Sequence, residues 1–515
     1  MPEDTDTDWR LPDTVDGRSA TIGAVLLVAL VAAAAWYFRP WLQGLVYLVY
    51  STPIVVVAVV VTALIYLALV RSGVPVGVNA AGVTFVAILI VGSGVGGLLA
   101  DETLGTRTMV DATETSNLSE VDADRPRIVT QSVSQRYASN TLNFPQYRLA
   151  GSDITVHNGT PHWSYALAPD GTWNHFTKQQ HGTVMVDMTR QNTRTKTFTG
   201  DLEKGIGTSF YNNYKWHVIK NGEFLVNYQD PFMVVHDDEQ YVAVPYTKPT
   251  FHWTPLPYTT PEWGGVVLVD EDGNVEDLSP SAARAHPVLD EQKLYPFSLA
   301  RQRVASTKYR NGILNTFTSH EDEIELAPVP GDNNDQPFAV FTEDGPELLV
   351  AVEPYGDAQG LKEVWTVDGR TGEYSRYSPE QSLFGPRKAT DYVRQAARTT
   401  DWNRFVPSEP IPVVVDGTLY WEVRVVPEDS SGIAYIAFVD AESSDVVEVD
   451  ESDAVRAFLR GESVPDANAT DGGDERDPAM VVQRVAENGT VLDTLEIFDD
   501  ESIEIRRGNE TASGR

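Results

Sequence analysis

Four histidines in one short stretch are the residues of this sequence whose type and spacing most readily suggest chemistry. They are His157, His162, His175 and His181, out of nine in the chain. Neutral imidazole nitrogens bind zinc and copper, so on adjacent strands they would form a metal site if their nitrogens converge. Half-buried strand histidines beside aromatic residues explain the same pattern, and the spacing leaves both interpretations open.

A second set of candidates consists of aspartates that directly follow an apolar run ending in valine. They are Asp187, Asp270, Asp368 and Asp440. Around Asp270, the residues Asp272 and Asn274 complete the 1-3-5 oxygen spacing of an EF-hand calcium loop. However, Val275 occupies the position that requires glycine, and Ser281 stands where the loop needs an acidic residue. We therefore predict that these aspartates accept hydrogen bonds from backbone amides and form turns.

The rest of the sequence contains none of the familiar catalytic motifs. It has no HExxH or GxSxG pattern, no phosphate loop and no dinucleotide fingerprint. The absence of cysteine excludes disulfides, thiolate metal sites and cysteine nucleophiles. The sequence therefore predicts a protein that is not an enzyme and has no cofactor. The alternative is a metal-binding receptor or enzyme centred on the four histidines.

Three uncharged apolar stretches precede everything else, at residues 20–38, 44–70 and 82–100. Each is long enough to cross a hydrocarbon core of about 30 Å as a helix. We therefore predict a multi-pass membrane protein with a three-helix anchor.

The positions of arginines near these stretches predict the orientation of the anchor. With the N-terminus inside, Arg10, Arg18 and Arg71 are cytoplasmic and Arg39 is outside. Residues 101–515 would then lie outside the cell. Candidate glycosylation sites agree with this placement, since all follow the third stretch: Asn117, Asn158, Asn468, Asn488 and Asn509.

The region beyond the anchor predicts an α+β fold of tandem antiparallel-sheet-plus-helix modules. Each module contains an apolar strand, a strand that ends in Val-Asp, a turn and a polar strand, as in residues 363–378. Helical patterns at 297–306 and 387–400 lie between modules and would cover one face of a sheet.

These patterns divide the chain into ten segments. We predict an acidic N-terminal segment (1–19), the membrane anchor (20–100), a polar spacer (101–126), four modules (127–200, 201–290, 291–385 and 386–462), an acidic linker (463–478), a C-terminal hairpin (479–507) and a tail (508–515).

The charge of the chain restricts its partners. Its net charge of −35 comes from 74 acidic and 39 basic residues. Such acidity is typical of proteins of halophilic archaea, whose carboxylates keep the surface hydrated in concentrated salt. Without a basic stripe to neutralise phosphates, nucleic-acid binding is excluded.

An aromatic and proline-rich stretch at 246–265 is the best candidate for partner contact. We predict a stiff loop in which Phe251, Trp253, Tyr258 and Trp263 offer rigid contact area. Folding of these aromatics onto their own module is the alternative. Contact with the membrane is disfavoured, because the stretch lies far along the chain from the anchor.

The strand endings HGTVMVDMTRQNTRTKTF, GGVVLVDEDGNVEDLS and EVWTVDGRTGEYSRYS resemble those of PepSY-like repeats in membrane-anchored extracytoplasmic proteins. The resemblance covers roughly residues 150–450, and residues 367–373 fit it best. It implies modules that bind or inhibit partners. The sequence thus predicts a non-enzymatic interaction, scaffold or regulatory protein of the cell envelope. Envelope proteins would be its partners, and it would form homo-oligomers through the membrane helices. A viral or mobile-element membrane protein is a further alternative.

Overall fold

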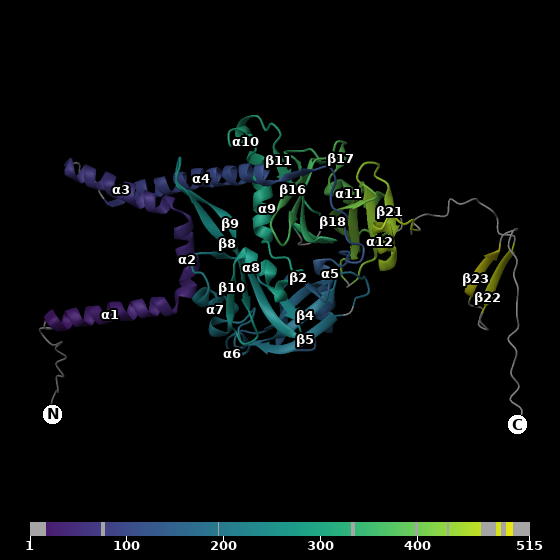
Figure 1. The fold of residues 1–515 in the computed structure, drawn as a ribbon, viewed down its shortest axis with the longest axis horizontal. Helices are drawn as coiled ribbons and strands as arrows, with labels where there is room; N and C mark the ends of the chain where they lie inside the picture. Colours follow the sequence, from purple (N-terminus) through teal and green to yellow (C-terminus); the bar gives the residue numbers. More distant parts are fainter. Residues whose placement is uncertain are drawn as a thin grey trace, which may run out of the picture. The chain divides into compact units, whose positions relative to one another are not determined.

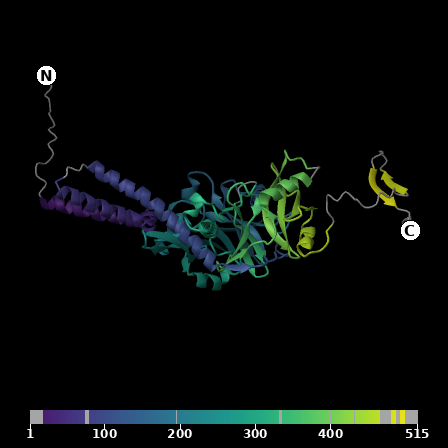
Figure 2. The same ribbon diagram turned by 90° about the horizontal axis from the view of Figure 1, so that it is seen from above.

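The computed structural model describes residues 17–73, 78–193, 195–330, 335–396, 400–429, 432–464, 480–485 and 491–497. The chain forms two compact units, residues 1–464 and 465–515. In the first unit, long helices lie at one end and antiparallel sheets at the other (Figure 1), and the view from above shows the same separation (Figure 2). The predicted mixed α+β class is confirmed.

The apolar helices of the first unit are α1 (Gly17–Tyr37), α2 (Arg39–Ser51), α3 (Ile54–Arg71) and α4 (Val78–Asp111). Residues Ile54–Arg71 and Ala80–Asp111 are each long and apolar enough to cross a membrane, and the pair α1–α2, bent by 85°, provides a third candidate span. The second apolar stretch, predicted as one helix over 44–70, is therefore wrong in its bounds. Pro53 separates α2 from α3, because proline cannot donate the next helical hydrogen bond.

Helix α4 runs without a break from the apolar stretch into the sheet region. Residues 101–126, predicted to be a polar spacer, are helical as far as Asp111. Leu104 and Thr108 are buried, and Arg303 donates to Thr108 Oγ1 and pairs with Asp111 at 2.7 Å. The polar composition was misleading, because this part of α4 packs along another helix rather than standing free in solvent.

Four antiparallel meanders form the sheet region. The first contains β2 (Tyr147–His157), β3 (Thr160–Pro169), β4 (Gln180–Asp187) and β5 (Thr195–Leu202). The second contains β7 (Phe232–His236), β8 (Glu239–His252), β9 (Tyr258–Val269) and β10 (Val275–Leu278), and β6 (Asn227–Tyr228) also pairs with β8.

The third and fourth meanders repeat this order. The third contains β12 (Phe338–Thr342), β13 (Gly345–Pro354), β15 (Glu363–Asp368) and β16 (Tyr374–Tyr377), extended by β1 (Thr113–Thr115) and β11 (Ile324–Leu326). The fourth contains β18 (Phe405–Val415), β19 (Thr418–Pro427), β20 (Tyr435–Asp440) and β21 (Val446–Val449). The short strands β14 (Gly360–Leu361) and β17 (Leu383–Phe384) pair with each other. In the second unit, β22 (Met480–Val485) and β23 (Val491–Ile497) pair antiparallel, within the segment 479–507 that was predicted as a hairpin.

Helices connect and cover the meanders. They are α5 (Gln131–Thr141), α6 (Asn174–Thr177), α7 (Tyr214–Asn221), α8 (Pro280–Ala285), α9 (Phe297–Ser306), α10 (Asn315–Thr318), α11 (Pro386–Ala396) and α12 (Ser452–Leu459). Thr130 caps α5 by accepting a hydrogen bond from Val133 N. The helices predicted at 297–306 and 387–400 correspond to α9 and α11, so the period of their apolar residues predicted them correctly.

The aspartates at the strand ends form turns, as predicted. Asp368 Oδ1 accepts hydrogen bonds from the backbone N of Arg370 and Thr371, both at 2.7 Å. Asp440 Oδ1 makes the same pair of contacts with Glu442 and Ser443. The side chains of Asp187 and Asp270 likewise accept from backbone amides of their own turns. Their carboxylates are thus engaged in fixing the chain reversal.

One large core joins three of the four meanders. It includes buried side chains of the first, third and fourth sheets together with those of α5, α9 and α12, among them Trp163, Val304, Trp365 and Phe438. Strand β2 also packs against β7, and β13 against β18. The first, third and fourth meanders therefore share one interior.

Candidate functional site

The structure does not bring the four predicted histidines together. His157 and His162 face each other with ring centroids 6.0 Å apart, but His157 lies against Val235 O and His162 against Thr160 O. Burial lowers the pKa of His162. His175 contacts Gly207 O at 2.6 Å, and His181 pairs with Asp201 at the same distance. Within the described ranges, no group of three or more His, Asp or Glu side chains is arranged to hold a metal ion.

The predicted partner-contact loop is a long hairpin. Residues 246–265 belong mostly to β8 and β9, which pair from Val242↔Val269 to His252↔Tyr258. The prolines concealed the strand pattern, because they interrupt the alternation on which a strand prediction depends. Tyr258 is buried, and Trp263 packs on Tyr295. Phe251 lies 5.0 Å from the ring of Tyr50, whereas Trp253 is 68% exposed.

Two of the five candidate glycosylation sites can be located. Asn117 and Asn158 are exposed. Asn468, Asn488 and Asn509 lie outside the described residues.

A cavity of about 350 Å³ lies where segments of the first three meanders meet. Asp153 on β2, Asp230 before β7 and Asp335 before β12 contribute carboxylates to its wall. Arg127, just before α5, and Arg301 on α9 contribute guanidinium groups. Trp163 and Phe297 provide aromatic surface. Six separate segments of the chain thus form one polar cavity with an aromatic part.

Lys293 fixes the carboxylate of Asp153. Its Nζ lies 2.8 Å from Oδ1 and 2.7 Å from Oδ2 of that residue. Lys293 is buried, and its Nζ lies 3.5 Å from the centroid of the Phe297 ring. Burial lowers the pKa of Lys293, and the Asp153 carboxylate opposes this effect. The pair therefore orients Asp153 at the cavity wall.

Arg301 holds the other side of the cavity. Its guanidinium pairs with Asp335 at 3.7 Å and donates a hydrogen bond to Gln336 O. The side chain of Gln336 donates to Ala327 O at 2.6 Å and accepts from Ala351 N. This segment is thus tied to the third sheet. We call Lys293–Asp153 and Arg301–Asp335 the open pairs, because Asp153, Arg301 and Asp335 line the cavity.

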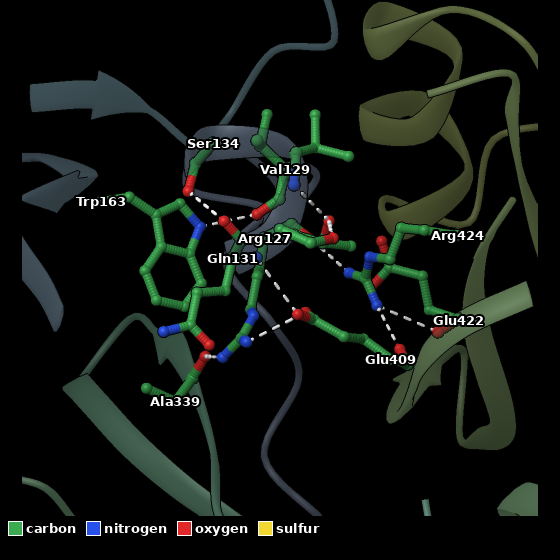
Figure 3. A network of polar contacts seen from close by, with 12 residues as sticks. Arg127, Val129, Gln131, Ser134, Trp163, Ala339, Glu409, Glu422 and Arg424 are labelled. Carbon is green, nitrogen blue, oxygen red and sulfur yellow. Dashed lines mark hydrogen bonds and ion pairs between the residues drawn. The ribbon is translucent and has the colours of Figure 1, made fainter. Parts of the chain in front are cut away.

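Arg127 also belongs to a buried cluster next to the cavity (Figure 3). It lies 3.0 Å from Glu409 Oε2 and donates to Ala339 O. Glu409 Oε1 accepts from Gln131 N. Arg424 donates to Glu409 O and pairs with Glu422 at 2.8 Å. We call Arg127, Glu409, Glu422 and Arg424 the closed cluster.

Burial and backbone geometry shape the closed cluster. Burial lowers the pKa of Arg127, opposed by Glu409, and raises the pKa of Glu422, opposed by Arg424. Glu409 has φ 47° and lies at a register shift between Ser408 and Ile411. A bulge of this kind redirects a strand side chain, and here it turns the Glu409 carboxylate toward Arg127. The cluster therefore links α5 to the third and fourth sheets.

The cavity has the chemistry of a site for hydroxyl groups. Its three carboxylates are acceptors, and both of its guanidinium groups are already paired with Glu409 and Asp335. A ligand with many hydrogen-bond donors and one apolar face would therefore fit this cavity. Its donors would bind the carboxylates, and its apolar face would pack on Trp163 and Phe297. Sequence reasoning missed this site, because its residues are spread from position 127 to position 337 and form no local motif.

Comparisons with known proteins give only distant similarities. No family model matches the sequence, and no curated protein matches it. A candidate glycoside hydrolase from Parabacteroides distasonis ATCC 8503 aligns with a TM-score of 0.20 and 10% identity over 65% of this chain and 79% of that one. A glycosyl hydrolase from Bacteroides ovatus gives 0.19 and 10% over 65% and 81%. The GH43_1 enzyme from Xanthomonas citri, complexed with xylotriose, gives 0.19 and 12% over 70% and 95%.

These neighbours contradict the prediction of a non-enzymatic scaffold, since all three are described as glycoside hydrolases or as a GH43_1 enzyme. That prediction and the exclusion of enzyme activity are withdrawn. The physical reason is that the motif search detects only residues close in sequence, whereas an active site assembled from several strands leaves no such pattern. TM-scores this low assign neither fold nor activity to this chain, so the proposal below is argued from the cavity alone.

Proposed function

We propose that the cavity between Asp153, Asp230 and Asp335 binds a neutral carbohydrate. The observation that carries this proposal is the Asp153 carboxylate, which Lys293 holds at 2.7–2.8 Å in the wall of a 350 Å³ cavity. A fixed acceptor of this kind orients a ligand hydroxyl without ordering a mobile side chain on binding.

The charges of the cavity favour a neutral ligand over an anionic one. Three carboxylates and two guanidinium groups line it, and Glu409 and Asp335 already neutralise the two guanidinium groups. An anion would therefore meet uncompensated negative charge. Sugar hydroxyls donate to carboxylates, and the C–H face of a sugar ring packs on an aromatic side chain such as Trp163.

Hydrolysis of the bound carbohydrate is a second candidate, favoured by the presence of more than one carboxylate in the same cavity. Glycosidases use a pair of carboxyl groups, one as acid and one as base or nucleophile. Asp153 is held by Lys293 at 2.7 Å, whereas the exposed Asp230 has no cation within ion-pair distance in the described ranges. In this candidate function the two residues would take different roles.

The test uses the purified full-length chain in lipid nanodiscs and high salt. Calorimetric titration with neutral, uronic-acid and amino-sugar oligosaccharides should show binding of neutral sugars. Asp230→Asn should weaken that binding at least tenfold, whereas Asp357→Asn, at an exposed position outside the cavity, should not change it. Binding of only charged sugars, or equal binding by D230N and D357N, would refute the proposal. Release of reducing ends by the parent chain and its loss in D230N separates hydrolysis from binding.

We also propose that the globular part faces the outside of the cell, with the N-terminus inside. The arginines beside the apolar stretches support this orientation. External protease on intact cells should remove a C-terminal epitope tag. A tag that survives while known surface proteins are cut would reverse the orientation.

The salt-adapted surface, the PepSY-like nature of the modules, the use of Asn117 and Asn158 for glycosylation, and the envelope partners remain predictions from the sequence. The same is true of self-association through the membrane helices.

A further inference from the structure

The β8–β9 hairpin reaches the membrane helices, although the residues that meet are 155 and 208 positions apart in sequence. Thr259 Oγ1 donates to Ser51 O at 2.6 Å, and Tyr258 OH lies 2.8 Å from Thr103 Oγ1. Tyr258 also lies beside Gly96, which is inside the apolar part of α4. The hairpin runs along α4 toward the spans (Figure 1). Its tip therefore lies at the level where α4 enters the apolar layer.

The tip of this hairpin exposes apolar side chains. Trp253 is 68% exposed, and Leu256 is 36% exposed. Trp253 stacks on Phe251 with an interplanar angle of 14°, so the exposed ring is held in place. Residues 249–261 contain no Asp, Glu, Lys or Arg, in a chain whose net charge is −35. Burial lowers the pKa of His252 in the same segment, which favours its neutral form. This uncharged tip contrasts with the acidic composition of the chain as a whole.

Helix α2 indicates where the membrane interface lies relative to the tip. It bends by 85° from α1 and joins α1 to α3, so it lies across the direction of the spans. Its polar side chains hold the globular part: Arg39 donates to Lys220 O at 2.9 Å, and Gln43 donates to Val226 O at 2.7 Å. Its apolar side chains, Trp41, Leu45 and Leu48, are 60–63% exposed. An amphipathic helix of this kind lies in the membrane interface, where tryptophan and tyrosine are enriched.

We propose that the β8–β9 tip inserts Trp253 and Leu256 into the lipid headgroup region and, together with α2, docks the globular part directly on the bilayer. The tip is continuous with the membrane-spanning helices, so lipid is the partner that would cover its exposed apolar side chains. Phe251 packs on Tyr50 of α2, and Tyr258 packs on α4, so the tip is fixed beside segments that are themselves in the bilayer. This inference does not depend on the ligand of the cavity.

The absence of cysteine makes a direct test practical, because one introduced cysteine is the only labelling site. Leu256→Cys carries a nitroxide spin label in the full-length chain in nanodiscs. The matched control is Glu442→Cys, an exposed position in the turn before β21 at the far end of the unit from the spans. Accessibility to oxygen, which partitions into lipid, is compared with accessibility to a water-soluble nickel chelate.

The label at position 256 should be more accessible to oxygen and at least several-fold less accessible to nickel than the label at position 442. Equal accessibility to nickel at the two positions would overturn the proposal. Protection from both reagents with dipolar broadening would show instead that a second copy covers the tip, and would also overturn it. If L256C fails to fold, Thr254→Cys, exposed on the same tip, gives the same measurement.

Discussion

The closed cluster and the open pairs use the same residue types in different surroundings. Arg127 and Arg424 are buried with Glu409 and Glu422, and their guanidinium groups also reach backbone carbonyls. Arg127 also reaches the cavity wall, but Glu409 and Glu422 do not, whereas the carboxylates of both open pairs line the cavity. An ion pair surrounded by protein fixes the position of chain segments. An ion pair at a cavity wall leaves carboxylate lone pairs for a ligand. The surroundings, more than the residue types, therefore separate a structural role from a binding role.

Breaking the closed cluster should have the largest effect on stability. Arg127→Met removes the guanidinium that pairs with the buried Glu409 carboxylate at 3.0 Å, so we expect a loss of about 3–5 kcal/mol of unfolding free energy. Thermal unfolding in nanodiscs measures it. Arg460→Met, which breaks the exposed pair with Asp124, should cost less than about 1 kcal/mol. Similar losses in the two variants would show that the cluster does not hold the sheets together.

Breaking an open pair should cost less and should depend on pH. Asp153→Asn leaves Lys293 buried without its carboxylate, and we expect a loss of about 2 kcal/mol at pH 7. Unlike arginine, lysine can release its proton. Burial holds the folded pKa of Lys293 below its usual 10.5. Without Asp153 the folded pKa of Lys293 falls further, so the loss should be complete below the folded pKa in the variant and should disappear as the pH rises through the folded pKa in the parent. A loss that is independent of pH between 7 and 10 would contradict this account.

Glu353 sharpens the comparison, because it is a buried carboxyl that lacks a salt-bridge partner within the described part of the chain. Burial raises its pKa to about 7, while Arg387 opposes the shift and Glu325 adds to it. The folded state thus binds the proton more tightly than the unfolded state. The contribution of protonated Glu353 to the free energy of unfolding is therefore fully present below pH 4.5 and is lost as the pH rises through 7.

Glu353→Gln should remove this loss. We expect the variant to be more stable than the parent at pH 8, by on the order of 2 kcal/mol, and nearly equal to it at pH 4. Melting temperatures measured across this pH range test the prediction. Glu343→Gln, at an exposed position, should show no such pH dependence. A parent chain whose stability does not fall between pH 5 and 8 would exclude a raised pKa for Glu353.

Local patterns predicted the elements of this fold well, but they did not predict the site. Strands that end in Val-Asp and the helix over 297–306 depend on neighbouring residues, and the structure has them where expected. The break at Pro53 and the helical extension to Asp111 depend on packing against other segments, which the sequence pattern does not contain. Asp153, Lys293 and Arg301 meet only after three meanders have formed. No spacing between them therefore carried a signal.

Removing an aspartate from one of the turns should have the smallest effect on stability. It also tests whether the four strands that end in Val-Asp are equivalent. Asp368→Ala removes the acceptor of two backbone amides in a half-buried turn, so we expect a loss of about 1 kcal/mol. Asp440→Ala removes the same two contacts in the fourth meander and should cost a similar amount. Neither change should alter carbohydrate binding, since both residues lie outside the cavity. If D368A abolished binding while D440A did not, that aspartate would have a role beyond its turn, and the four strand endings could no longer be treated as equivalent.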